Sequence, residues 1–587
     1  MKKLGKTLEN TLYSIKYIWE ISPQYIMLTI FGSVVASAFN IISLYVLKYI
    51  ATTLEANNVS GFLSAIVLMF VISIVLSMVN GNIGYLLEPI MQNNITEKIQ
   101  NDIYEKAKQF YFEEFENKDF YNLYYFVIEN GKSSIVKSVN MILGILTCIL
   151  SSFGICGIVL QYDFVVVIIA GIGVVISYVC SMQMKQIQHN FKIDTIPNNR
   201  EISYIQRIFY IKDYIKEILA FSQSNVIEEK YKEAWKNLNN LTKKWGKRLC
   251  ILYIIIMQVN EITELLILVY LGYQVITGKI LLSEFLVLYT GIQQMIQQLK
   301  LVIENIPELY SNALDIDKCF EFMNKKTGHE KDLREVDRIS FIKFKDVSFS
   351  YDNERKNIDK VSFELGDKIK TLAIVGKNGS GKSTITKLLT GFYHSYTGDI
   401  YINDTNLNLL SRESYRARIA IMFQDFKLFS MTIAQNLKMK YEINDFEKRE
   451  INTILDFVQL NDEIRKLPNK TDTILSKEFD ENGIYLSGGE QQKIALARSL
   501  LQQADVIILD EPFSNMDNLS ATKVLNGIRR IIGDRMLILI THRLEGLSDI
   551  DEIIFMEDGC IAERGTEKEL LQKQGKYYEL YEININR

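Results

Sequence analysis

Long apolar runs are the feature that most constrains how this chain of 587 residues can fold. A helix that crosses a bilayer needs about 20 mostly apolar residues. Windows of that length and composition occur at 24–50, 61–88, 134–160, 163–182, 250–277 and 281–306. Six such helices with short connections would be hard to pack in water, so the runs predict an all-α domain of six transmembrane helices over residues 1–323.

The connections between these windows alternate in length. Those at 51–60, 161–162 and 278–280 are short, whereas 89–133 and 183–249 are long, polar and helical in pattern. The basic residues of the long connections are Lys98, Lys106, Lys108, Lys132, Lys185, Lys192, Arg200, Lys230, Lys243, Lys244 and Arg248. Because cytoplasmic loops carry the excess of Lys and Arg, we expect the long connections and both chain ends to lie in the cytoplasm, with the protein in the cell membrane.

The character of the sequence changes at 324–338, a polar linker with few apolar residues. Beyond it, short β-branched runs alternate with helical patterns, which predicts an α/β domain with a largely parallel sheet over 339–587. The net charge of −4 and the absence of a basic tail give no reason to expect a nucleic-acid partner. The six cysteines show neither CxxC nor metal-like spacing, so no disulfide framework is expected.

Residues 376–383, GKNGSGKS, match the pattern GxxxxGK[ST] of a phosphate-binding loop. The match follows the apolar strand TLAIV and opens a helix, which is the context that the pattern requires. Lys382 is expected to reach the β- and γ-phosphates, and the Ser383 hydroxyl to bind Mg²⁺. The chain is therefore predicted to bind ATP with Mg²⁺. The residues expected to hold the nucleotide in this loop are Gly376, Asn378, Gly379, Ser380, Gly381, Lys382, Ser383 and Thr384.

The apolar strand VIILD ends in two carboxylates, Asp510 and Glu511. A buried strand that brings Asp510 to the sheet edge suits Mg²⁺ beside the phosphates. Glu511 follows directly and is expected to orient or polarise the attacking water. Two further strand ends carry candidates: Gln424 for contact with Mg²⁺ or water, and His542 for the γ-phosphate.

The stretch LSGGEQ, which begins at Leu486, is a second possible phosphate cradle. Ser487, Gly488 and Gly489 come just before a helix, where free N–H groups and the helix dipole favour an anion. One nucleotide already has a cradle in residues 376–383. We therefore expect the second cradle to close over the γ-phosphate of a nucleotide held by another subunit, in a head-to-tail dimer with two ATP molecules.

With these residues in place, 340–587 resembles the nucleotide-binding domain of ABC transporters, and 1–323 looks like the membrane half of an ABC exporter half-transporter. The resemblance implies that Tyr351 stacks on adenine, Glu511 is the catalytic base, and His542 stabilises the γ-phosphate. The segment that the family calls the D-loop commonly reads Ser-Ala-Leu-Asp, and here it reads SNMD at 514–517. The resemblance implies that Asp517 in this segment bridges the two sites. The resemblance also implies a partner half-transporter. A homodimer is the simplest assembly, and a heterodimer is the alternative.

Segment 112–126 lies where such a family would dock a coupling helix, and the stretch before LSGGE resembles peptide and lantibiotic exporters. The resemblance thus favours a peptide as cargo. Because only about 20 residues precede the first span in this sequence, no cargo-trimming protease domain is expected there. The same architecture also serves lipid or drug exporters, and an ATP-gated membrane regulator that does not pump is a further alternative. Intact Glu511 and His542 argue against a pure switch.

Polar residues inside the last two spans suggest where cargo binds. Asn260, Glu261 and Glu264 lie in span five and Gln294 and Gln298 in span six. Ionisable groups there cost about 2.5–3.5 kcal/mol each to place at a helix centre, so we expect them to face a water-filled cavity suited to a cationic or amphipathic cargo. The alternative is that they pair across helices or sit near a membrane surface.

Overall fold

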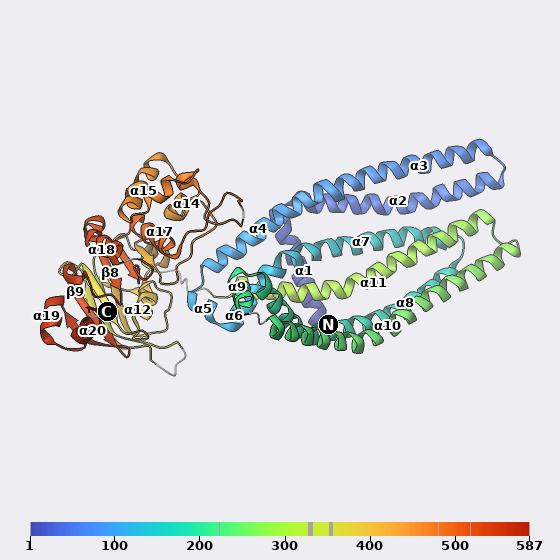
Figure 1. Ribbon diagram of the computed structural model, residues 1–587. Coiled ribbons are helices and arrows are strands. Elements are labelled where there is room, and N and C mark those ends of the chain that lie inside the picture. The colour runs from blue at the N-terminus through green and yellow to red at the C-terminus, as the bar shows by residue number, and fades with distance from the viewer. Residues whose placement is uncertain are drawn as a thin grey trace. The chain divides into compact units, whose positions relative to one another are not determined.

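The computed structural model describes residues 2–221, 224–326, 333–351, 356–478, 480–516 and 518–585. The chain forms two compact units, which are described separately. The first contains 1–108 and 119–325, and the second contains 109–118 and 326–587. The first is helical and the second is α/β, which confirms the predicted fold class (Figure 1).

The first unit is built from long helices. They are α1 (Lys2–Ile21), α2 (Pro23–Glu55), α3 (Val59–Asn82), α4 (Glu88–Lys108), α6 (Lys118–Phe126), α7 (Lys132–Leu160), α8 (Phe164–Tyr210), α9 (Lys212–Phe221), α10 (Ser224–Ile276) and α11 (Leu282–Asn324). Single π-helical turns, Ile83–Leu87 and Val127–Gly131, join α3 to α4 and α6 to α7. The long polar connections are therefore mostly continuations of the apolar helices, as their periodicity indicated.

Five helical segments in the described part of the chain are long and apolar enough to cross a membrane. They are Pro23–Glu55, Val59–Lys108, Lys118–Leu160, Phe164–Lys192 and Asn225–Ile276. Large apolar side chains on them, such as Phe70 and Phe153, are exposed in the single chain, as expected for helices that lipid covers.

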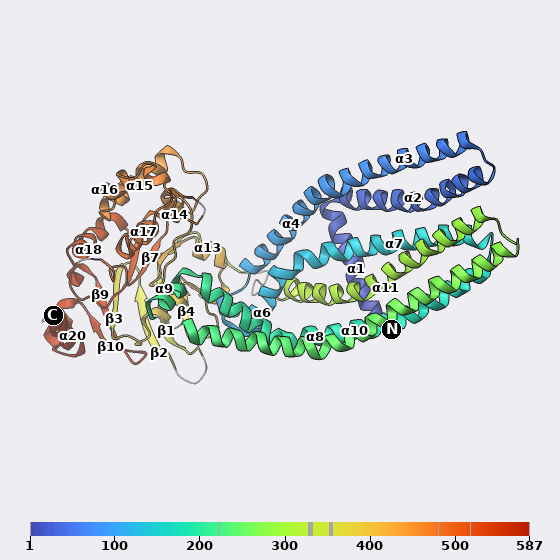
Figure 2. The ribbon, with the colours of Figure 1, turned by 45° about the vertical axis from the view of Figure 1, so that its right-hand side comes forward.

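The sixth predicted span lies in α11, which does not reach the same apolarity over its described residues. Its glutamines dilute the apolar character, and protein covers much of it instead. Leu288, Ile292 and Met295 are buried in a core with residues of α2, α7, α8 and α10. Figure 2 shows α11 running beside α7. The sixth span therefore stays a prediction.

The N-terminal helix α1 packs against α7 and α11. Its buried polar residue Asn10 donates its side-chain N–H to the Ala313 carbonyl at 2.9 Å and to an Asp317 carboxylate oxygen. These contacts hold part of α1 on protein rather than leaving it free at a membrane surface.

The second unit contains two sheets. The larger has the order β10-β9-β3-β8-β7-β6, and all its pairs are parallel except β10 with β9. The smaller has the antiparallel order β2-β1-β4-β5. The strands are β1 (Ile342–Phe349), β2 (Ile358–Leu365), β3 (Thr371–Gly376), β4 (Thr397–Ile402), β5 (Thr405–Asn406), β6 (Ile419–Met422), β7 (Val506–Asp510), β8 (Met536–Ile540), β9 (Glu552–Glu557) and β10 (Cys560–Gly565).

The central strands are buried on both faces, as parallel strands between helices usually are. Every residue of β3, β7 and β8 is buried. Two apolar clusters, one containing Ala373 and the other Leu372, share these strands because alternate side chains point to opposite faces. The helices of this unit are α5 (Phe112–Glu116), α12 (Lys382–Leu389), α13 (Arg412–Arg416), α14 (Ile433–Lys438), α15 (Asp445–Phe457), α16 (Asn461–Arg465), α17 (Gly488–Leu501), α18 (Asn518–Ile532), α19 (Glu567–Lys573) and α20 (Lys576–Ile585).

One segment of the first long connection belongs to the second unit. Residues 109–118 fall within the predicted transmembrane domain, but in the structure they belong to the α/β unit, on which α5 packs. Phe112 stacks on Phe392 with ring centroids 5.0 Å apart, and the Tyr393 hydroxyl donates to a Glu116 carboxylate oxygen at 2.7 Å. Aromatic stacking and a charge-assisted hydrogen bond thus hold α5 in place.

At the start of β3, Asp551 ties several chain segments together. Its carboxylate accepts from the backbone N–H groups of Lys370 and Thr371 and from Arg529. Burial acts to raise the pKa of Asp551, but the hydrogen bonds from Thr371 and Arg529 outweigh burial and hold the pKa below its ordinary value.

We expect Asp551→Asn to lower the stability of this unit by about 1–3 kcal/mol at neutral pH, because charge-assisted hydrogen bonds at the start of β3 are lost. Thermal unfolding of the purified full-length chain measures the difference. Because the folded pKa is depressed, the difference shrinks as the pH falls through that pKa. The control is Asp534→Asn, which removes an almost fully exposed partner of Lys370 and is expected to change little. Equal effects of the two substitutions would contradict this account.

Candidate functional site

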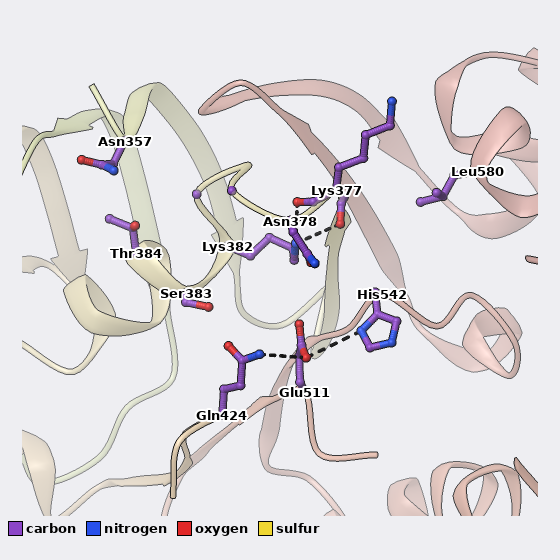
Figure 3. Close-up of a pocket in the computed structure, with 13 residues that line it drawn as sticks. Asn357, Lys377, Asn378, Lys382, Ser383, Thr384, Gln424, Glu511, His542 and Leu580 are labelled. Carbon is purple, nitrogen blue, oxygen red and sulfur yellow. Dashed lines mark hydrogen bonds and ion pairs between the residues drawn. The ribbon is translucent and has the colours of Figure 1, made fainter. Parts of the chain in front are cut away.

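A cavity of about 550 Å³ opens where β3 and β7 end. Figure 3 shows the side chains around it, drawn from the loop before α12, from the turn after β7, and from the residues after β8 and β6. The cavity is lined by Asn357, Gly376, Lys377, Asn378, Gly379, Gly381, Lys382, Ser383, Thr384, Gln424, Glu511, His542 and Leu580. The structure therefore brings most of the predicted phosphate-binding and catalytic residues together.

The loop between β3 and α12 adopts a conformation that only glycines allow easily. Gly376, Gly379 and Gly381 have φ values of 151°, 82° and 99°. A Cβ on Gly376 would lie 2.3 Å from the Met556 carbonyl oxygen, so no larger residue fits there. The loop ends at the N-terminus of α12, where free backbone N–H groups favour an anion.

Lys382 is buried at the centre of this loop. Its ammonium donates to the carbonyl oxygens of Gly376 and Lys377 at 2.9 and 2.8 Å. Burial lowers the pKa of Lys382, while the nearby carboxylates Glu511 and Asp510 act in the opposite direction. These two acceptors hold the ammonium within the loop.

Asp510 ends β7 and is buried. Burial raises its pKa to about 6, and a hydrogen bond from Ser383 partly offsets that effect. Its oxygen Oδ1 is buried without a hydrogen-bond partner. A buried, unsatisfied carboxylate oxygen near a serine hydroxyl is a donor set that suits a hard divalent cation.

Glu511 points into the cavity between two other side chains (Figure 3). Its Oε2 accepts from the Gln424 amide at 3.1 Å and lies 3.7 Å from His542 Nδ1. The backbone of Glu511 has φ of 49°, which is unusual for a residue with a side chain. A carboxylate placed between an amide and an imidazole is equipped to orient and deprotonate a water molecule.

Tyr351 lies beside the loop rather than among the cavity-lining residues. Its hydroxyl approaches the Thr384 hydroxyl at 3.5 Å, and its ring meets Tyr393 edge-on with centroids 5.5 Å apart. Tyr351 is 44% exposed, which leaves surface for an aromatic base.

Ser487, Gly488 and Gly489 do not line the cavity of their own chain. Ser487 caps α17 in a capping box with Glu490, and a Cβ on Gly488 would meet nothing within 4 Å. Ser487–Gly489 therefore lie at a helix start outside this cavity, and their role in holding a phosphate stays a prediction. Asp517 lies outside the described residues.

Three residues of the cavity were not singled out from the sequence. Lys377 occupies a variable position of the GxxxxGK[ST] pattern, so its place within the motif could have marked it as a residue of the site. Asn357 and Leu580 come from the segment before β2 and from α20, and no motif marks either of them.

The polar residues of the predicted cargo site are partly paired across helices. Buried Asn260 accepts from the Ser177 hydroxyl at 3.2 Å, and Glu264 lies 3.5 Å from the Gln293 amide. Glu261 is exposed in the single chain, and Gln294 and Gln298 are half-buried. For Asn260, pairing between α8 and α10 accounts for a polar residue in an apolar helix. The cargo role of these residues stays a prediction.

Comparison with known proteins adds to this geometry. Residues 358–514 match the family model described as ABC transporter. The chain is 30% identical to the ATP-dependent lipid A-core flippase of Idiomarina loihiensis over 60% of this chain and 60% of that protein. It is 25% identical to the nisin transport ATP-binding protein NisT of Lactococcus lactis subsp. lactis over 99% of this chain and 97% of that protein. It is 26% identical to the subtilin transport ATP-binding protein SpaT of Bacillus subtilis over 97% and 92%.

Among solved structures, a bacterial Atm1-family ABC exporter with ATP bound is similar in fold. The TM-score is 0.78 at 21% identity, and the alignment covers 96% of this chain and 98% of that one. The two chains therefore share the arrangement of a helical part followed by an α/β part.

We expect Gly381→Ala to reduce the affinity for a fluorescent ATP analogue at least tenfold, because a Cβ there would lie 2.6 Å from the Asn357 carbonyl oxygen and distort the loop. The matched control is Gly391→Ala, just after α12. Gly391 also has a positive φ, but a Cβ there meets nothing within 4 Å, so only backbone strain of about 1 kcal/mol is added. Equal losses of binding in the two variants would show that the close approach at Gly381 is unimportant.

Proposed function

The chain belongs to the ABC transporter family, and from that premise we propose that it is an ATP-driven exporter that works as a dimer. The observation that carries the proposal is the placement of Glu511 between Gln424 and His542 beside a phosphate-binding loop. In the described part of the other unit, five helical segments are long and apolar enough to span a membrane. These parts suit hydrolysis and transport in one protein.

In this proposal the loop around Lys382 holds the phosphates, and Glu511 takes a proton from the water that attacks the γ-phosphate. Gln424 positions the carboxylate, and His542 contacts the γ-phosphate. Asp510, Ser383 and Gln424 would hold Mg²⁺, which would neutralise phosphate charge. In the described residues no group of three or more His, Cys, Asp and Glu could hold a metal alone, so the nucleotide itself would supply further ligands.

Two chains are needed to complete each site in this account. Ser487–Gly489 lie outside the cavity of their own chain, and the space beside Gly488 is open. A helix start with free N–H groups in an open setting is suited to the γ-phosphate of a nucleotide on a second copy. ATP then joins the two α/β units, and hydrolysis releases them.

The packing of α5 supports coupling between hydrolysis and transport. The chain leaves the membrane helices at α4, enters the α/β unit at 109–118, and returns through α6 to α7. His394 stacks on Tyr111 with centroids 4.2 Å apart, and Arg412 lies over the same ring. Because α5 is held by the α/β unit, closure of that unit would pull on α4 and α6 together.

For cargo, we favour a cationic or amphipathic peptide. NisT and SpaT, whose names describe nisin and subtilin transport, align with nearly the whole chain, whereas the lipid A-core flippase aligns with 60% of it. Glu264, half-buried and near Gln293, offers a negative charge to such a peptide. A lipid or drug exporter of the same architecture is the second candidate, favoured by the flippase relative. An ATP-gated regulator that does not pump is the third.

A complementation experiment tests the shared site. One chain carries Lys382→Met and the other Ser487→Arg, so a head-to-tail mixed dimer keeps one complete site, whereas each homodimer keeps none. We expect mixed dimers, isolated with two affinity tags, to occlude one ATP per dimer and both homodimers to occlude none. A mixed dimer that occludes none while unmutated tagged dimers occlude ATP would contradict the shared site.

Transport is tested in proteoliposomes with outward-facing ATP sites. We expect ATP-dependent accumulation of a labelled cationic peptide against a gradient, and no steady accumulation with Glu511→Gln.

Glu264→Gln is expected to weaken the apparent affinity for that peptide about fivefold, which corresponds to about 1 kcal/mol for the loss of one partly screened charge pair. The affinity for a neutral analogue of the peptide is expected to stay unchanged. Unchanged affinity for the cationic peptide would exclude Glu264 from the cargo site. ATP-dependent lipid transfer without peptide uptake would favour the flippase, and ATP-dependent leakage without accumulation would favour the regulator.

A further inference from the structure

Gln492, in the second turn of α17, is buried and uses its whole amide for contacts with one short segment. Its Nε2 donates to the Glu511 carbonyl oxygen and to the Ser514 hydroxyl, both at 2.9 Å. Its Oε1 accepts from the Asn515 N–H at 2.7 Å. One side chain therefore fastens α17 to the turn that begins at Glu511.

That turn begins with a strained residue. Glu511 has φ of 49°, and the following Pro512 narrows the conformations open to it. Such a backbone costs about 1–3 kcal/mol and persists only where the surroundings hold it. Here the Glu511 N–H donates to the Ile540 carbonyl at 2.9 Å, and its own carbonyl accepts from Gln492. The two bonds fix the peptide groups on both sides of the Glu511 Cα and hence the direction of its carboxylate.

A glycine on the same face of α17 lets the helix approach this turn closely. Gly489 precedes Gln492 by three residues, and a Cβ on it would lie 2.8 Å from the Asn515 carbonyl oxygen. The N-terminal part of α17 thus packs directly on the backbone of the 511–515 turn. The next residue, Lys493, reaches the Gln459 carbonyl instead. The face of α17 that carries Gly489 and Gln492 therefore makes these contacts with the turn that begins at Glu511.

We infer that Gln492 is a positioning residue for hydrolysis, which holds the Glu511 carboxylate in place through the peptide group and links it to the helix that begins at Ser487–Gly489. The inference rests on the proposed function. A γ-phosphate bound at Ser487–Gly489 restrains α17, and through Gln492 it restrains the Glu511 of the same chain, which serves the other nucleotide of the dimer. Each bound ATP thereby helps to order the catalytic carboxylate of the opposite site.

The test is Gln492→Glu in the full-length dimer. This change keeps the shape and the acceptor for Asn515, but removes both donors to Glu511 and Ser514. We expect kcat for ATP hydrolysis to fall at least tenfold, because a small displacement of a catalytic group has effects of this size. Equilibrium ATP binding is expected to stay within twofold. Since a protonated carboxyl regains one donor, the ratio of variant to unmutated kcat should rise as the pH is lowered from 8 to 6.

Two further variants separate positioning from folding. Lys493→Met on the same helix removes a hydrogen bond that does not reach Glu511, and its kcat is expected to be unchanged. Gln492→Asn keeps the amide but shortens it, and its kcat is expected to fall with ATP binding intact. Unchanged kcat in both Gln492 variants, or loss of folded protein in both, would overturn the inference. If the unmutated dimer itself hydrolysed no ATP, the proposed function would fail instead.

Discussion

The parallel pairing of β3, β8 and β7 is the interaction on which the rest of the α/β unit depends. Ile374 of β3 pairs with Ile540 of β8, and Ile540 pairs with Asp510 of β7. Because the strands are parallel and in register, the phosphate-binding loop, the carboxylates after Leu509 and the histidine after Thr541 emerge at one edge. Burial on both faces makes a slip of this register costly, since it would carry apolar side chains out of their clusters.

At the same edge, charged groups are buried close together. Burial lowers the pKa of Lys382 and raises the pKa of Asp510, so both groups are pushed toward their neutral forms. Phosphate oxygens and a divalent cation would supply the opposite charges that these groups lack. The positive φ of Glu511 adds backbone strain at the same place. A site that is costly to build without its ligand is a common property of catalytic centres.

Several parts of this arrangement could be predicted because their residues are neighbours in the chain. Residues 376–383 carry their own glycines, lysine and hydroxyl, and Asp510 and Glu511 follow a run of four apolar residues. The apolar windows of the first unit were equally local. The sixth window shows the limit of that reasoning, because composition alone does not reveal that protein packing covers much of α11.

The sequence by itself determined the local chemistry: the phosphate loop, the paired carboxylates, the helix start at Ser487 and the apolar helices, each of which depends on residues within one continuous segment. Only the tertiary structure decided which of these meet. The 109–118 segment joins a unit more than 200 residues away, Asn357 and Leu580 line the cavity, and Gln492 holds the Glu511 peptide group. Such contacts join distant parts of the chain through packing and hydrogen bonds between single groups, and no periodicity or short motif records them.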